Sequence, residues 1–186
     1  MPRSARTVMN NVAYHVVCRG SQRQKLFYSD KDFEKFLALL WKYKNKYNAK
    51  IYAYCLMSNH IHLLAQSEKG DLSDIIRDFK NHTSKKFLEI VSDNIESRSD
   101  WMKIVFEYHG KYKNKQTNQV WTHENHAEHI YSDKFIKQKI NYIHENPVRA
   151  GIVEKPEEYL CSSARNYAEL DSVLDVIRID YKWNTV

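Results

Sequence analysis

Residues 50–66 read KIYAYCLMSNHIHLLAQ, and the pattern of this stretch decides the fold. In residues 50–57 the side chains fall alternately on two faces, as they do along a β-strand. Ser58-Asn59 is a tight-turn pair, and residues 60–66 form a second strand-like segment. We therefore predict that the two segments pair as an antiparallel hairpin.

The regions around this hairpin alternate between strand-like and helical patterns. Ser29 and Asp32 have the spacing of a helix cap, and Pro147 ends a later helix because proline cannot continue the hydrogen-bond ladder. The further predicted elements are a strand over 12–19, a helix over 29–47, a helix over 72–87, a strand near 120–130 and a helix over 132–146. This order predicts an α+β fold.

The composition is that of a basic, globular protein. The chain has 186 residues, of which 42% are hydrophobic and 28% charged, with a mean hydropathy of −0.69. No apolar run reaches membrane-spanning length and no signal-peptide pattern is present, so we expect a cytoplasmic protein with no membrane partner. The net charge of +6 favours a polyanionic partner.

The whole chain is predicted to form one domain. Residues 1–155 form its body, and residues 92–118 are interpreted as a long, partly irregular insertion that is rich in lysines and aromatic residues. Residues 156–186 are a tail of the same domain with one more short helical pattern.

His60-Ile61-His62 is the sharpest local feature. Residues two apart on a strand point to the same face, so both imidazoles can meet one cation while Ile61 points to the core. Two ligands are too few for a closed structural zinc site and suit an open metal site. With 9 histidines in the chain, a chance pair that only packs is the alternative. Three other histidines lie in a stretch interpreted as solvated and polar: His123, His126 and His129.

Tyr142 lies on the polar side of the helix predicted over 132–146. The apolar stripe that should face the sheet consists of Ile136, Ile140 and Ile143. The residues one turn away from Tyr142 are instead polar: Gln138, Lys139, Glu145 and Asn146. This position distinguishes Tyr142 from a core tyrosine, although the chain has 13 tyrosines and a plain surface residue is the alternative.

Three motifs resemble a known family. Residues 57–64, MSNHIHLL, resemble the HUH motif of IS200/IS605-like transposases, in which two histidines flank a bulky apolar residue. Residues 142–153, YIHENPVRAGIV, resemble the YIxxNPVRAGLV signature of REP-associated tyrosine transposases, and residues 159–164, YLCSSA, resemble part of their C-terminal segment. The chain departs from the family where Trp121 is followed by Thr122, since relatives often have Trp-Gln there.

The resemblance implies a ferredoxin-like antiparallel sheet with helices packed on one face, the histidines on a central strand and the catalytic tyrosine on a helix. It implies a bacterial, nucleoid-associated enzyme, monomer or homodimer, that cuts and rejoins single-stranded or hairpin DNA through a 5′-phosphotyrosine. By motif position, Tyr142 is the nucleophile, and His60, His62 and Asn146 hold Mg²⁺ or Mn²⁺. A tyrosine hydroxyl ordinarily ionises near pH 10, so we expect the metal and Lys139 to assist Tyr142.

Basic and aromatic residues are the candidates for DNA binding, because cations contact phosphates and rings stack on bases. The candidates are Arg19, Arg23, Lys111, Lys113, Lys115, Arg149, Tyr112 and Trp121.

Three other functions are compatible with the same residues. One is a domesticated protein that binds DNA hairpins without cutting them. Another is a hydrolytic metallophosphoesterase that uses an activated water, and this enzyme would not need Tyr142. The third, a zinc-binding structural protein, is the poorest, because Cys18, Cys55 and Cys161 lack ligand spacing.

Overall fold

The computed structural model describes residues 11–27, 29–68, 72–92, 99–111, 117–122 and 126–179. In chain order its elements are β1 Ala13–Arg19, η1 Ser21–Arg23, α1 Asp30–Lys46, β2 Lys50–Met57, β3 His60–Gln66, α2 Leu72–Ser92, α3 Ser99–Lys111, β4 His126–His129, α4 Asp133–His144, α5 Asn146–Arg149, η2 Pro156–Glu158 and α6 Ala164–Tyr167. The hairpin strands 50–57 and 60–66 have the predicted bounds, and Ser29 and Asp32 form the capping box of α1. No helix within the described ranges is long and apolar enough to cross a membrane.

The four strands form one sheet in the order β2-β3-β1-β4, and every neighbouring pair is antiparallel. With the helices included, the order is βαββαβ, which is the ferredoxin-like arrangement. The predicted α+β fold is confirmed. Because β3 lies between β2 and β1, the strand that carries the histidine pair occupies the middle of the sheet.

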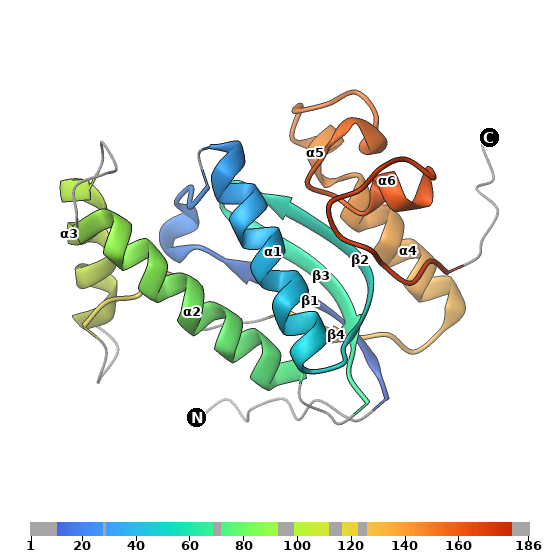
Figure 1. Ribbon diagram of the computed structural model, residues 1–186, viewed down its shortest axis with the longest axis horizontal. Helices are drawn as coiled ribbons and strands as arrows, with labels where there is room; N and C mark the ends of the chain where they lie inside the picture. Colours follow the sequence, from blue (N-terminus) through green and yellow to red (C-terminus); the bar gives the residue numbers. More distant parts are fainter. Residues whose placement is uncertain are drawn as a thin grey trace.

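Helices cover both faces of this sheet. The larger core lies under α1 and α2 and contains the β3 residues Ile61, Leu63 and Ala65. A smaller core lies on the other face, where Ile140 and Ile143 of α4 pack against β2 and β3. Figure 1 shows α1 crossing the sheet and α4 lying to its right. Helices α1 and α2 thus share one face as expected, whereas α4 covers the opposite face.

The segment predicted as a partly irregular insertion contains a regular helix, α3. Met102 and Phe106 are buried on one side of α3, with the i, i+4 spacing of an amphipathic helix. Exposed apolar residues, among them Trp101 and Ile104, lie next to and between these positions, so the sequence shows no clear helical period. The fourth strand is also shorter than predicted, because only 126–129 pair with β1, and Trp121 forms a separate bridge to Gly20.

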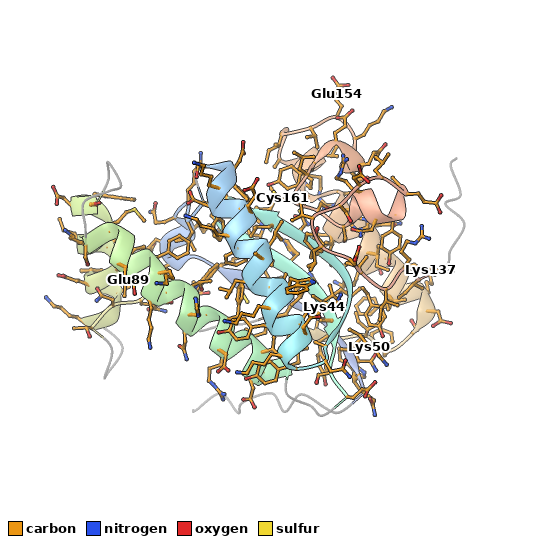
Figure 2. The ribbon with its side chains drawn as sticks, in the orientation of Figure 1. Lys44, Lys50, Glu89, Lys137, Glu154 and Cys161 are labelled. Atoms are coloured by element: carbon orange, nitrogen blue, oxygen red, sulfur yellow. The ribbon has the colours of Figure 1, made fainter. Side chains whose placement is uncertain are left out.

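The C-terminal segment lies along the outer edge of β2. Leu56 donates its backbone N–H to the carbonyl of Cys161 at 2.9 Å, and Ser163 donates to the carbonyl of Tyr54 at 3.0 Å. Cys161 is labelled in Figure 2. These bonds occupy backbone groups that an edge strand would otherwise leave open to another chain. The tail is therefore an integral part of the sheet's edge.

His144, the last residue of α4, is fully buried, and its Nε2 atom lies 2.8 Å from the hydroxyl of Ser163. Burial lowers the pKa of His144 to about 3, whereas an unfolded histidine titrates near 6.5. The unfolded chain therefore binds more protons below pH 6.5, and stability that is complete above that pH is lost as the pH falls toward 3.

The variant His144→Gln tests this proton linkage, because an amide can still bond Ser163 but does not titrate. We expect the free energy of unfolding to fall less in the variant than in the wild type between about pH 8 and about pH 5.5, by roughly 1.4 kcal/mol. Urea melts at the two pH values measure this difference. An equal loss in both proteins would show that His144 is not protonated on unfolding.

Candidate active site

His60 and His62 point from β3 toward the face of the sheet that α4 covers. Ile61 between them lies in the opposite core, as predicted. The ring centroids of His60 and His62 are 4.9 Å apart, with an edge-to-face angle of 79°. The backbone of β3 therefore holds two imidazoles side by side.

A third imidazole, His15 of β1, joins this pair. Its Nε2 atom lies 3.0 Å from Nδ1 of His62, and the two rings stack with centroids 5.3 Å apart. On β4, Glu128 is the register partner of His15, and its Oε2 lies 4.0 Å from His15 Nδ1. Neither His15 nor Glu128 is among the site residues predicted from the sequence. The alternation of β1 could have indicated His15, because it lies on the face opposite Tyr14 and Val16.

Burial lowers the pKa of all three imidazoles. The pKa of His15 and of His60 falls to about 4, and that of His62 falls to about 2 because His60 and His15 add to the effect of burial. The three rings are therefore neutral near pH 7. Nδ1 of His60 lies 2.5 Å from Oδ1 of Asn59, and Nδ1 of His62 bonds His15, so the Nε2 atoms are the nitrogens left for a ligand.

Tyr142 of α4 lies against this cluster. Its ring centroid is 5.6 Å from that of His62 and 5.9 Å from that of His15, in edge-to-face contact with both. The side chain is 41% exposed, so part of the phenol remains open to solvent. Arg149 covers the ring, with Cζ 4.5 Å from its centroid. A single chain thus brings together the phenol and the imidazoles that the sequence analysis selected.

The histidine pair has the features of an open metal site. Within the described part of the chain, no three His, Cys, Asp or Glu side chains are grouped closely enough to hold a metal ion. His60 and His62 nevertheless offer two neutral nitrogens, each fixed by a hydrogen bond at the opposite ring nitrogen, as metal-binding histidines are. These two donors fit a divalent cation whose other ligands come from water or substrate.

Asn146, the third expected ligand, is engaged with the end of α4. Its amide nitrogen donates to the carbonyl of Tyr142 at 2.8 Å and to that of Ile143 at 3.3 Å. The amide nitrogen is thus bonded to the backbone of the candidate nucleophile, one turn earlier in the chain, and the metal-binding role of Asn146 stays a prediction.

Lys139 lies between Glu128 and Tyr142. Its Nζ atom is 2.6 Å from Glu128 Oε2 and 5.6 Å from the ring centroid of Tyr142. The predicted proximity to the phenol is present. However, the carboxylate of Glu128 offsets part of the positive charge that Lys139 could offer a phenolate.

Three of the predicted DNA contacts adjoin the site. Arg19 is the register partner of His60, the backbone carbonyl of Arg23 accepts a bond from Asn59, and Arg149 covers Tyr142. Lys111 is exposed at the end of α3, far from α4 (Figure 1). The remaining insertion candidates, Tyr112, Lys113 and Lys115, lie outside the described residues.

Trp121 is not a base-stacking residue, contrary to the prediction. Its side chain is 4% exposed and packs in the larger core near Phe27 and Phe36. The indole N–H donates to the hydroxyl of Thr83 at 2.8 Å. Because both its ring and its polar group are satisfied inside the protein, Trp121 stabilises the fold.

The fold and the contact between a helix-borne tyrosine and paired histidines are those expected of the tyrosine transposase class. Residues 8–146 match the family model of IS200-like transposases, and the chain belongs to this family. A solved structure of a REP-associated tyrosine transposase bound to a REP hairpin has the same fold: its TM-score is 0.65 at 16% identity, over 97% of this chain and 95% of that chain. A candidate transposase from Deinococcus radiodurans R1 gives a TM-score of 0.43 at 14% identity, over 77% of this chain and 96% of that chain. No curated protein matches.

Proposed function

We propose that this IS200-like transposase is a metal-dependent single-strand DNA endonuclease and strand transferase. It acts on hairpin-containing DNA through a 5′-phosphotyrosine intermediate. The observation that carries this proposal is the contact between Tyr142 and His62, whose ring centroids are 5.6 Å apart within one chain. The hairpin bound by the structurally similar protein supports DNA hairpins as the substrate. Because one chain supplies both groups, a monomer can carry a complete site.

In the transfer step, the phenol oxygen of Tyr142 bonds to the phosphorus of the scissile phosphate, and the bond from phosphorus to the 3′-oxygen breaks. The phenol loses its proton, and the leaving oxygen takes one up. The products are a 5′-phosphotyrosine and a DNA end with a free 3′-hydroxyl. Attack by a 3′-hydroxyl on the phosphotyrosine reverses the step and joins strands without ATP.

The Nε2 atoms of His60 and His62, with Asn146 and water as further ligands, would hold Mg²⁺ or Mn²⁺. When bound there, the cation supplies positive charge that offsets the charge developing on the phosphate. Arg149, which covers the ring of Tyr142, restricts the orientation of the phenol. Lys139 adds a cation beside that phenol.

His15 acts as a positioning residue for His62. The carboxylate of Glu128 favours a proton on the near nitrogen of His15, Nδ1, which leaves Nε2 of His15 as an acceptor. His62 then donates its Nδ1–H to His15 and keeps the lone pair of its own Nε2 for the cation. The chain from Glu128 through His15 thus selects the tautomer of His62 that can bind metal.

Replacing His15 should weaken metal binding before any chemistry occurs. We expect His15→Ala to lower the Mn²⁺ affinity of the DNA-free protein roughly 10- to 100-fold, because His62 loses its hydrogen-bond partner. Titration followed by electron paramagnetic resonance of free Mn²⁺ measures the affinity. His15→Gln, whose amide oxygen can accept the bond, should recover part of the loss, and His129→Ala serves as an exposed histidine control. An unchanged Mn²⁺ affinity in His15→Ala would show that His15 does not position His62.

The proposed function is tested by incubating the protein with a pool of single-stranded hairpin oligonucleotides and Mg²⁺ or Mn²⁺. A denaturing gel should show a protein–DNA adduct and a released strand that ends in a 3′-hydroxyl. Products with free 5′-phosphates and no adduct would favour the hydrolytic mechanism. Binding without any cleavage would overturn the enzymatic proposal.

A further inference from the structure

We propose that Tyr131, just before α4, and Phe135, in its first turn, form a base-stacking platform for the unpaired DNA strand that leads to Tyr142. This inference rests on the proposed function and adds a binding subsite to it. The ligand is a single-stranded segment next to the scissile phosphate, recognised through the flat faces of its bases.

The two rings are stacked face to face, and the outer one, Tyr131, is mostly in solvent. Tyr131 is 72% exposed, and its ring stacks on that of Phe135 with centroids 4.6 Å apart and an angle of 18° between the planes. A single exposed aromatic residue is common on protein surfaces. A pair of stacked rings, one of them mostly in solvent, presents the kind of surface on which a nucleobase stacks.

This platform is continuous with the candidate active site. Phe135, Lys139 and Tyr142 follow each other at helical spacings of four and three residues, so they share one side of α4. Lys139 Nζ bridges the two rings, 5.0 Å from the centroid of Phe135 and 5.6 Å from that of Tyr142. From Phe135 to Tyr142 the helix rises roughly 10 Å, or about three stacked nucleotides at about 3.4 Å each.

The charge of the same segment suits a polyanionic strand. Residues 131–149 carry four basic side chains, Lys134, Lys137, Lys139 and Arg149, against two acidic ones, Asp133 and Glu145. Lys134 is exposed beside Phe135, and Lys139 lies on the same side of α4 as Phe135 and Tyr142. Lys137 is also exposed, but it lies on the opposite side of the helix. Rings for bases and cations for phosphates are the combination that single-strand binding surfaces use.

Equilibrium binding tests the platform apart from the chemistry. The protein carries Tyr142→Phe throughout, and three fluorescent probes share one hairpin. One probe has an unpaired oligothymidine tail, another has a tail of the same length made of abasic nucleotides, and the last has a blunt end. We expect the thymidine tail to bind roughly 5- to 100-fold more tightly than the abasic tail, because stacking needs bases. Tyr131→Ala should remove most of this preference and leave binding of the blunt hairpin unchanged.

Trp41→Ala is the matched control, since Trp41 is a 54% exposed aromatic residue on α1, across the sheet from α4. It should keep the preference for the thymidine tail. If Tyr131→Ala prefers the thymidine tail as strongly as the parent protein does, the proposed stacking platform is contradicted. Adduct formation by the wild type would in that case still support the proposed function. If the parent binds neither tailed hairpin and the wild type forms no adduct, both proposals fall.

Discussion

Tyr142→Phe is expected to abolish the covalent adduct between the protein and hairpin DNA. The substitution removes the oxygen that bonds to phosphorus and keeps the ring that contacts His62 and His15. We expect the rate of strand cleavage to fall by at least about 10³-fold, the scale seen when a nucleophile is removed. A denaturing gel with DNA labelled on the 3′ side of the cut measures adduct and cleavage together.

Hairpin binding should survive in Tyr142→Phe, because the phenol oxygen contributes to chemistry and not to holding the strand. Tyr108→Phe is the control, since Tyr108 is a 54% exposed tyrosine on α3, remote from α4. An adduct that persists in Tyr142→Phe would assign the nucleophile to another residue.

Replacing the histidine pair should have an effect of similar size by a different route. We expect His60→Gln and His62→Gln each to lower the cleavage rate roughly 10³-fold. Without the cation, the transition state loses several kcal/mol of charge stabilisation. Chelation by EDTA should reduce wild-type cleavage to the same level. The free energy of unfolding of each variant, from urea melts, separates loss of the metal from loss of the fold.

The two sets of variants together distinguish the three DNA-related functions. Transesterification needs Tyr142 as well as His60 and His62, whereas hydrolysis by an activated water needs only the histidines. A protein that only binds hairpins needs none of the three. Cleavage that resists both EDTA and the histidine substitutions would contradict the metal site.

Much of the fold could be predicted because its signals are local. The alternation in residues 50–57, the turn at Ser58-Asn59 and the capping pair Ser29 and Asp32 each lie within a few residues of each other. Helix α3 was missed because apolar side chains that are exposed, Trp101, Ile104 and Tyr108, lie among its buried positions and weaken the helical period.

The site could be predicted only in part, because some of its contacts depend on strand register. His60 and His62 share one face of any strand, and this needs no knowledge of pairing. His15 and Glu128 come from two other strands, and the register of β1 against β3 and β4 decides that they meet His62. Trp121 was misassigned for a related reason: its burial follows from packing under α2, which a basic, aromatic stretch of sequence does not reveal.

The distance between the nucleophile and the imidazoles is set partly by a residue that belongs to neither group. The hydroxyl of Ser163 forms a hydrogen bond with His144 at the end of α4, and its backbone N–H donates to the carbonyl of Tyr54 in β2. Ser163 therefore links α4 to β2, the strand beside β3. A fragment that ended at Val153 would keep Tyr142, His60, His62 and Asn146, but it would lack the two hydrogen bonds of Ser163. Having every reactive group is therefore not sufficient for activity, and protein fragments prepared for activity assays should extend past α6.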